Sequence, residues 1–481
     1  MSAFAEPVNQ PSVVAGEKLS PYLRAVLAVV LAADVLDLMD STITTIAAPS
    51  IAHHLGGGES LIKWLGAGYA LAMGVLLVVG GRLGDRYGRR RMFLAGIAGF
   101  TLASVVCGLA QDPTMLIAAR IVQGGFGAML IPQGIGILTT TIPREQQPRV
   151  FFAFGPVLGG SAILGPILAG FIINLNIAGL NWRPIFLINI ILGGAGFLAA
   201  LRVLPHDQPN RGEVIDGVGA GLLGAAMLAL LYGLIQGSTN GWSTGPIACL
   251  VAGLAFFVAF AWRQRVATNP LILPTLLGNR GFTAGMLLGL FFFAAVAGFA
   301  YVVSLFLQTA LHRSPGQAAL GLSPMMVGII IASFASRPAS SILGRKLVFI
   351  GLTLTVVGAV WMWTIVHVGG VSISQWDLAP ALLVLGAGMG ACFGSIYEIA
   401  VGDITASEAG SASGSLSAVQ QLANAIGAAT VTTVYFAQVH HGGQAHAMTI
   451  SLAIVALIAT ACLGPALLLP RTKNPALEHD A

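Results

Sequence analysis

Long apolar runs follow one another along almost the whole chain, and they constrain the fold more than any other feature. Of the 481 residues, 56% are apolar and only 9% are charged, whereas a soluble domain carries about 25% charged residues. About 20 apolar residues in a helix span the hydrocarbon core of a bilayer. Backbone groups in lipid must pair within their own segment, so continuous runs favour helices over a barrel. The sequence therefore predicts an all-α polytopic membrane protein.

Fourteen segments satisfy a hydropathy window of about 19 residues. They cover roughly 22–51, 62–81, 91–110, 113–140, 149–174, 183–204, 216–236, 244–264, 281–310, 322–340, 346–367, 377–403, 411–438 and 446–469. We expect each to be a transmembrane helix, with boundaries uncertain by several residues.

The basic residues give an independent test of this count. If the N-terminus is cytoplasmic, 19 of the 23 lysines and arginines fall on the cytoplasmic side and one, Arg120, lies within a span. The outer side then holds Lys63, Arg183 and Arg313. Because cytoplasmic loops are enriched in Lys and Arg, this asymmetry predicts an even number of spans with both termini in the cytoplasm.

The order of the segments indicates two halves separated by an insert. "GGRLGDRYGRRRMFLAG" follows the second segment and is weakly repeated by "ASRPASSILGRKLVFIG" after the tenth. Parallel halves around an axis normal to the membrane are a known transporter architecture. We expect a disordered cytoplasmic N-terminus, a six-helix half, a two-helix insert, a second six-helix half and a cytoplasmic tail, over residues 1–20, 21–204, 205–270, 271–469 and 470–481.

Three aspartates lie in the first segment, where carboxylates are costly. Asp34, Asp37 and Asp40 follow one another at steps of three residues. Each step turns a helix by about 300°, so the three side chains cover an arc of about 120°. All three are expected to face a central cavity, one per turn. Asp40 is predicted to carry a proton, and Asp34 and Asp37 to contact substrate or carry a second proton.

Arg120 is the basic residue that lies deep in a span, which makes it a functional candidate. It lies about seven residues, roughly 10 Å, into the fourth segment, and Asp40 lies about eleven residues, roughly 16 Å, from the outer end of the first. The depths are close enough for Arg120 to reach Asp40, either for proton coupling or as a purely structural ion pair. Gln123, one turn further on, is expected to contact substrate.

The loop after the second segment, "GRLGDRYGRRR", combines regularly spaced glycines with an acid among arginines. Glycines permit close helix approach and tight turns, and the acid is expected to pair with an arginine or cap a helix. The alternative is plain cytoplasmic positive charge. We interpret the loop as a gating or structural lock, formed by Gly81, Gly84, Asp85, Arg86, Gly88 and Arg89.

Two further features belong to single segments. "GPVLGGSAILGPILAG" contains Gly165 and Pro166, and its glycines and prolines allow close packing and bending. Glu398 lies near the inner end of the twelfth segment and is a candidate substrate or proton site, unless it extends to the interface. The sequence shows no metal-ligand cluster, no nucleophile–base pair at depth and no GxxxxGK[ST] phosphate loop. We therefore expect no enzyme activity, metal or cofactor, and a proton gradient as the energy source.

These motifs resemble the signatures of the major facilitator superfamily. The fourteen segments, the Gly-Pro motif and "LMDSTITTIAAPSI" are similar to its fourteen-span drug–proton antiporter branch. The resemblance implies that Asp40 couples to protons, that Arg120 is its partner and that Gly165-Pro166 is the antiporter hinge. Departures are Ala169 in place of a glycine, Pro184 at the start of the sixth segment, and Gln420 and Gln421 where some multidrug members carry acids.

The predicted function is proton-coupled export of amphipathic drugs or antibiotics, cationic ones among the candidates, by alternating access across the plasma membrane of a bacterium. The expected partners are a small-molecule substrate, protons and the lipid bilayer, with no nucleic acid, and the expected state is a monomer. Two alternatives stay open: a proton-coupled importer of a small metabolite, and a lipid-translocating protein without ion coupling.

Overall fold

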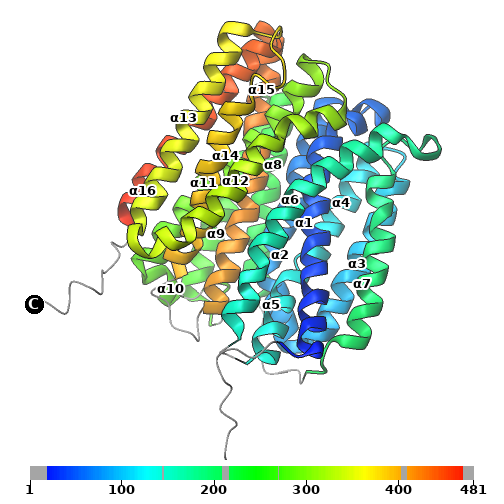
Figure 1. Cartoon of the computed structure of the whole chain (residues 1–481), viewed down its shortest axis with the longest axis vertical. Coiled ribbons are helices and arrows are strands. Elements are labelled where there is room, and N and C mark those ends of the chain that lie inside the picture. The colour runs from blue at the N-terminus through cyan, green and yellow to red at the C-terminus, as the bar shows by residue number, and fades with distance from the viewer. Residues whose placement is uncertain are drawn as a thin grey trace, which may run out of the picture.

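The computed structural model describes residues 19–143, 146–207, 216–268, 270–272, 274–401 and 409–469, and within them every regular element is helical. Figure 1 shows the helices as a bundle of roughly parallel rods. This arrangement confirms the expected all-α class. We call α1–α7 the N-terminal half, α8 and α9 the insert, and α10–α16 the C-terminal half.

The helices follow the predicted apolar segments closely. The N-terminal half contains α1 (Pro21–Leu55), α2 (Gly58–Tyr87), α3 (Arg89–Leu109), α4 (Pro113–Gly127), α5 (Leu130–Thr141), α6 (Gln147–Leu175), the short 3₁₀ turn η1 (Ile177–Gly179) and α7 (Pro184–Val203). The insert contains α8 (Gly217–Asn240) and α9 (Thr244–Val266). The C-terminal half contains α10 (Pro274–Gly278), α11 (Arg280–Leu305), the π-helical turn η2 (Phe306–Ala310), α12 (Pro315–Leu343), α13 (Arg345–Gly369), α14 (Ala379–Val401), α15 (Ala409–Ala461) and α16 (Leu463–Leu468).

Several helices begin at side-chain caps that the sequence encodes locally. Ser20 Oγ accepts from the backbone N–H of Leu23 at 3.2 Å, and Asp112 Oδ1 accepts from that of Met115 at 2.9 Å. In both helices a proline occupies the first position, where its missing N–H costs nothing. Such caps satisfy N–H groups that have no partner within the helix.

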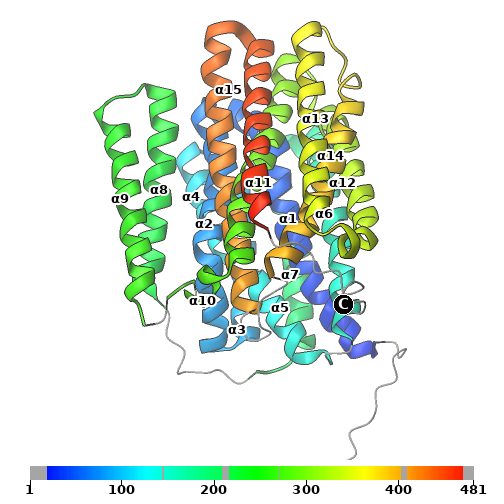
Figure 2. The same ribbon diagram turned by 90° about the vertical axis from the view of Figure 1, so that its left-hand side faces the viewer.

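One predicted segment is interrupted, and two others, 411–438 and 446–469, form the two arms of one long helix. The segment 113–140 divides into α4 and α5 because Pro132 has no N–H to donate to the carbonyl of Ala128. A methyl group on Gly80 of α2 would overlap that carbonyl oxygen, so α2 passes very close to the break. The long α15 bends at Gly443, whose φ of 79° is positive, and Figure 2 shows its two arms running in opposite directions.

Ten helices within the described residues are long and apolar enough to cross a membrane. The helix α1 is not among them, which fits its three aspartates, and the stretch Gly414–Leu468 contains two of the predicted segments. The number of fourteen spans therefore stays a prediction, while the multi-pass character is confirmed.

The two halves share one apolar core at the end of the bundle that holds the α1–α2 connection, which we call the α1–α2 end. There Ile46 and Ile51 belong to the same buried cluster as Phe299. Polar contacts join the halves at the same end. Ser304 Oγ donates to Thr45 O at 3.0 Å, Gln308 Nε2 to Ile46 O at 3.1 Å and Asn174 Nδ2 to Ser314 Oγ at 3.4 Å.

At the opposite end, a separate apolar cluster contains Val30, Phe93 and Ile137 of the N-terminal half together with Ala418 of α15. The insert forms a hairpin at one edge of the bundle (Figure 2), where α8 packs against α2 and α15. Arg82 at the end of α2 donates to Pro270 O, just after the insert, at 2.8 Å. At the α1–α2 end the two halves are thus joined both by one apolar core and by hydrogen bonds.

Candidate functional site

A buried ion pair between α1 and α4 forms the centre of the candidate site. Arg120 Nη1 donates to Asp40 Oδ2, and both side chains are at most 1% exposed. The other carboxylate oxygen, Asp40 Oδ1, accepts from Gln123 Nε2 at 2.9 Å and from Asn189 Nδ2 at 2.7 Å. The ion pair expected from the two depths is therefore present, and its proton-coupling role stays a prediction.

Ser104 of α3 completes the surroundings of this pair. Its hydroxyl accepts from Gln123 Nε2 at 2.6 Å and from Asn189 Nδ2 at 3.1 Å, and it donates to the carbonyl of Phe100 at 3.0 Å. Gln123 Oε1 in turn accepts from Arg120 Nη1 at 2.7 Å. Polar side chains of α3, α4 and α7 thus surround one carboxylate of α1, directly or through the two amides, as a buried charge requires.

Asp37 has a different partner from Asp40. The hydroxyl of Tyr69 on α2 donates to Asp37 Oδ1, and the guanidinium carbon of Arg120 lies 4.3 Å from the centre of the Tyr69 ring. Phe186 of α7 approaches the same guanidinium, with its ring centre 5.6 Å away. The cation is therefore enclosed by one carboxylate and two aromatic faces, a favourable arrangement for arginine.

Asp34 lies one turn further from the α1–α2 end and is 6% exposed. Its Oδ1 is buried and has no hydrogen-bond partner among the residues that the structure describes. Glu398 belongs to α14, but its side chain lies outside the described part of the chain. The predicted substrate contacts of Asp34, Asp37, Gln123 and Glu398 stay predictions. The structure places Gln123 within the ion-pair network.

The loop motif between α2 and α3 makes contacts that join three helices. Gly84 leaves room for Gln133 of α5, whose Nε2 donates to Gly80 O at 2.6 Å. Arg89 Nη1 donates to Gly136 O at 2.7 Å. These contacts are consistent with a lock between α2, α3 and α5.

The turn of this motif is built on Gly88, whose φ of 99° suits a residue without Cβ. Asp207, which follows α7, accepts from the backbone N–H of Arg89 and, at 3.4 Å, of Arg90. The cap of α3 therefore comes from Asp207. The side chain of Asp85 lies outside the described residues, so its expected pairing is untested. Of the remaining motif residues, Gly81 lies against Pro132 and Arg86 lies over Tyr87.

The Gly-Pro motif of α6 packs directly beside the ion pair. A methyl group on Gly165 would overlap Thr42 Oγ1 and approach Met39 O at 3.2 Å. Gly165 therefore permits α6 to approach α1 within one turn of Asp40. Further along, a methyl group on Gly170 would lie 2.5 Å from the Cα of Gly316, where α6 meets α12. The hinge role of Gly165 and Pro166 stays a prediction.

Sequence reasoning missed Tyr69, Ser104 and Asn189. Each is a polar side chain within a long apolar segment, and that signal was available. Asn189 also lies in the stretch "NWRPIFLIN". The sequence pattern did not indicate that these side chains converge, because the partners of Asp40 lie up to 149 positions away in the chain.

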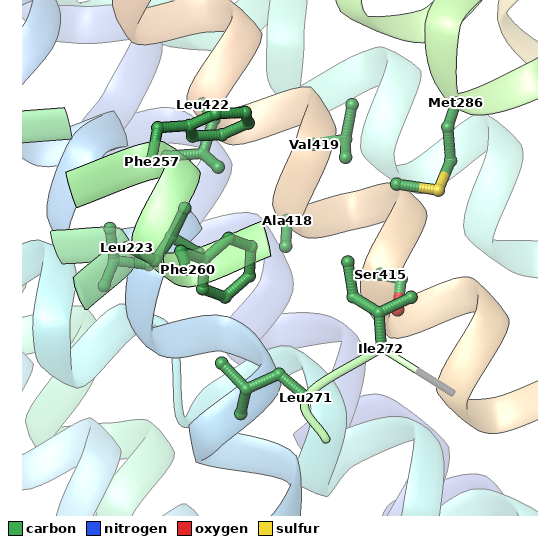
Figure 3. A pocket seen from close by; sticks show the side chains of 11 residues that line it. Leu223, Phe257, Phe260, Leu271, Ile272, Met286, Ser415, Ala418, Val419 and Leu422 are labelled. Atoms are coloured by element: carbon green, nitrogen blue, oxygen red, sulfur yellow. The ribbon is translucent and has the colours of Figure 1, made fainter. Parts of the chain in front are cut away.

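A separate apolar cavity of about 140 Å³ lies between the insert and the two halves. Figure 3 shows Leu223 and Phe260 of the insert on one side of it and Met286 of α11 on the other. Ser415 supplies the polar side chain of its lining. No charged group lines this cavity, so it is distinct from the carboxylate site.

The described residues contain no cluster of three or more His, Cys, Asp or Glu side chains that could hold a metal ion. The chemistry available at the site is proton exchange. Asp34, Asp37 and Asp40 are all buried in α1, and Arg120 forms an ion pair with Asp40. A buried carboxylate without such a partner is costly.

The chain is similar to known proteins along most of its length. Residues 30–428 match the family model described as Major Facilitator Superfamily. The probable actinorhodin transporter of Streptomyces coelicolor is 40% identical over 423 residues, which cover 86% of this chain and 73% of the relative. The puromycin resistance protein of Streptomyces alboniger is 30% identical, and the match covers 93% of this chain and 92% of the relative. The tetracenomycin C resistance and export protein of Streptomyces glaucescens is 30% identical, with 82% and 72% covered.

Solved structures agree in fold. A POT family transporter in complex with 5-aminolevulinic acid has a TM-score of 0.67 at 15% identity, covering 92% of this chain and 96% of the other. A bacterial homologue of the human lysosomal transporter Spinster, in an inward-facing conformation, has a TM-score of 0.63 at 14% identity, with 94% and 98% covered.

Proposed function

The chain belongs to the Major Facilitator Superfamily, and from this premise we propose that it is a proton-coupled antiporter that exports amphipathic drugs or antibiotics across the bacterial plasma membrane. The observation that carries the proposal is the buried Asp40–Arg120 pair with its amide donors, Gln123 and Asn189. An ionisable group inside a membrane helix is a functional site by default.

The proposed mechanism uses the proton as the switch of this ion pair. Two unit charges about 4 Å apart attract by about 4 kcal/mol at an effective dielectric constant of 20. Protonation of Asp40 removes one of the charges and therefore frees Arg120 and the helices that carry them. Burial favours the neutral carboxyl and the neighbouring guanidinium favours the charged form, so opening the site to one side or the other changes the proton affinity.

The energy available is sufficient for export. A proton that moves down 100 mV and a tenfold concentration difference supplies about 3.7 kcal/mol. That energy balances a substrate gradient of about five hundredfold for each proton, by the same arithmetic.

We also propose fourteen spans arranged as six, two and six, with both termini cytoplasmic. The coincidence of the helices with the predicted segments supports this division, as does the charge asymmetry. In this topology the α1–α2 end faces outward. The shared core there supports a conformation closed to the outside. Cysteine labelling from the two sides of the membrane tests the topology.

The substrate class rests on the relatives. One is named for actinorhodin transport, one for puromycin resistance and one for tetracenomycin C resistance and export. We infer an amphipathic antibiotic as substrate, held near Asp34, Asp37 and Glu398. We also infer that no enzyme activity or cofactor is involved and that the protein acts as a monomer.

Growth of a pump-deficient host on a broad panel of toxic compounds tests the proposal. The wild-type chain is expected to confer resistance to at least one compound, and Asp40→Asn is expected to abolish it. Asp112→Asn is the matched control, because asparagine also caps a helix and Asp112 is exposed. Full resistance with Asp40→Asn at equal expression contradicts the assignment.

Two alternatives are separated by further measurements. In vesicles, substrate that accumulates on the side to which an imposed pH jump drives protons indicates a symporter. A lipid-translocating protein without coupling releases no protons when substrate is added in detergent, whereas the antiporter does.

A further inference from the structure

The structure distinguishes the second carboxylate, Asp37, from the first. Asp40 is bound by Arg120 and two amides, whereas the hydroxyl of Tyr69 donates to Asp37. The same tyrosine places its ring against the guanidinium of Arg120, with 4.3 Å between ring centre and guanidinium carbon. The buried side chain of Tyr69, 3% exposed, therefore contacts both Asp37 and the guanidinium of Arg120.

The helix α4 leaves space for this tyrosine. A methyl group on Gly127 would lie 2.8 Å from Asp37 Oδ1 and 2.9 Å from the Tyr69 hydroxyl, and a methyl group on Gly124 would overlap Tyr69 O. Atoms at such distances clash. The helix that carries Arg120 therefore has glycines where Tyr69 and Asp37 meet, and any displacement of α4 changes the space around their hydrogen bond.

Among the described residues, few titratable or charged groups lie near these two carboxyls. Besides each other, they are Asp34 on the same helix, Tyr69 on α2, Arg120 on α4 and Cys107 on α3, which lies 3.6 Å from Gln123 Oε1. Arg120 forms an ion pair with Asp40, and no described cation forms one with Asp37. An unpaired buried carboxylate is costly, which makes Asp37 a candidate for a second proton.

We propose that Tyr69 is a positioning residue that couples Asp37 to Asp40, so that the two carboxyls take up and release protons as a pair and the transporter moves two protons per cycle. This inference rests on the proposed antiport function. It assigns the second proton to Asp37.

The coupled step runs as two proton transfers with no other reactant. Asp40 accepts a proton from the open side and its ion pair with Arg120 breaks. The guanidinium then leaves the face of Tyr69, the ring moves, and its hydroxyl leaves Asp37 Oδ1. Asp37, without that donor and without the nearby cation, accepts the second proton. Release to the other side follows the reverse order.

The experiment is an infrared titration of carboxyl groups in the purified, unliganded protein in nanodiscs. Asp37→Asn and Asp40→Asn identify the two bands. In the wild type the two bands are expected to change together as one cooperative transition. In Tyr69→Phe, which keeps the ring beneath Arg120 but lacks the hydroxyl, the link between the two carboxyls is lost. The bands are then expected to separate by about one pH unit or more, the size of one hydrogen bond to a charged group.

Controls distinguish coupling from a structural role. Tyr435→Phe removes the hydroxyl of another buried tyrosine, in the C-terminal half, and is expected to leave the titration unchanged. Tyr69→Leu also removes the ring and is expected to shift the Asp40 band further than Tyr69→Phe does. Thermal unfolding verifies that each variant folds.

Two titration results overturn the proposal: bands that are already separate in the wild type, or a Tyr69→Phe titration identical to the wild type. Because no substrate is used, this failure is distinguishable from failure of the antiport function, which the growth panel tests. A proton-to-substrate ratio of one in wild-type proteoliposomes that show antiport contradicts the inference alone.

Discussion

The helices α1 and α11 are the first long helices of the two halves and contact each other, yet their buried surfaces have opposite chemistry. Asp34, Asp37 and Asp40 are all buried in α1. In α11 no acidic residue occurs, and its buried surface includes Phe292 and Phe293.

The aromatic rings of α11 form their own cluster with α14. Phe292 and Phe293 lie 5.6 Å and 5.4 Å, between ring centres, from Phe393. Such aromatic pairs stabilise the packing by more than the burial of their surface area alone does. Of these two helices, α1 therefore carries the buried carboxyl groups, while α11 supplies an apolar wall.

The largest effect is expected from Arg120→Leu. It leaves the Asp40 carboxylate buried without its cation, which destabilises by about 3–5 kcal/mol. The double variant Asp40→Asn/Arg120→Leu removes both charges and is expected to recover most of that stability while transport stays absent. Thermal unfolding of the three variants completes the cycle. A double variant no more stable than the single one would show that the pair is not the source of the effect.

Phe292→Ala tests the apolar side of the comparison. Removal of this buried ring, which is 1% exposed, is expected to cost about 3 kcal/mol. The titration of the Asp40 carboxyl is expected to stay unchanged, because no charge of the N-terminal half is touched. Leu287→Ala, at a site 42% exposed on the same helix, serves as the mild control. A shift in the Asp40 titration would mean that the apolar packing of α11 affects the carboxyl groups of α1.

Gly165→Ala is expected to destabilise the protein by about 1–3 kcal/mol and to slow transport, because the added methyl group meets Thr42 beside Asp40. Thr42→Ala removes the obstructing hydroxyl and is expected to restore part of both losses. Gly194→Ala is the control, since nothing lies within 4 Å of its added methyl group. Equal effects of the two glycine substitutions would refute the close approach of α6 to α1.

The smallest effect is expected from His440→Ala at the α1–α2 end. Its Nε2 lies 3.0 Å from Glu59 Oε1, but the two side chains are 69% and 27% exposed. Exposed ion pairs contribute about 1 kcal/mol or less, so the unfolding temperature is expected to change little. His441→Ala is the matched control. A loss well above that range would make this contact part of the closure between the halves.

The division into α4 and α5 shows the limit of what the sequence alone predicts. Apolar length predicted one segment over 113–140, and the cap at Asp112 is a local signal. The structure adds that Gly80 of α2 packs closely against the carbonyl of Ala128 at the break. A property of two helices in contact is not encoded in the hydropathy of either one.

The Asp40–Arg120 pair was predictable because depth along a helix follows from residue counting, at about 1.5 Å for each residue. The cap on the N-terminus of α3 was not. Asp85 lies within the motif, but the cap comes from Asp207, 118 positions beyond Arg89. Local spacing predicts hydrogen-bond partners that are near in sequence, whereas helix packing can bring in partners from distant parts of the chain.

By itself, the sequence determined the helices, the concentration of carboxylates in α1 and the depth of Arg120, because apolar length and helical rise are local properties. The tertiary structure alone decided that Tyr69, Ser104 and Asn189 converge on these charges. It also separated Asp37 from Asp40 by giving them different partners. The physical reason is that a buried charge is stabilised by whichever donors surround it, and helix packing selects those donors from helices that lie far apart along the chain.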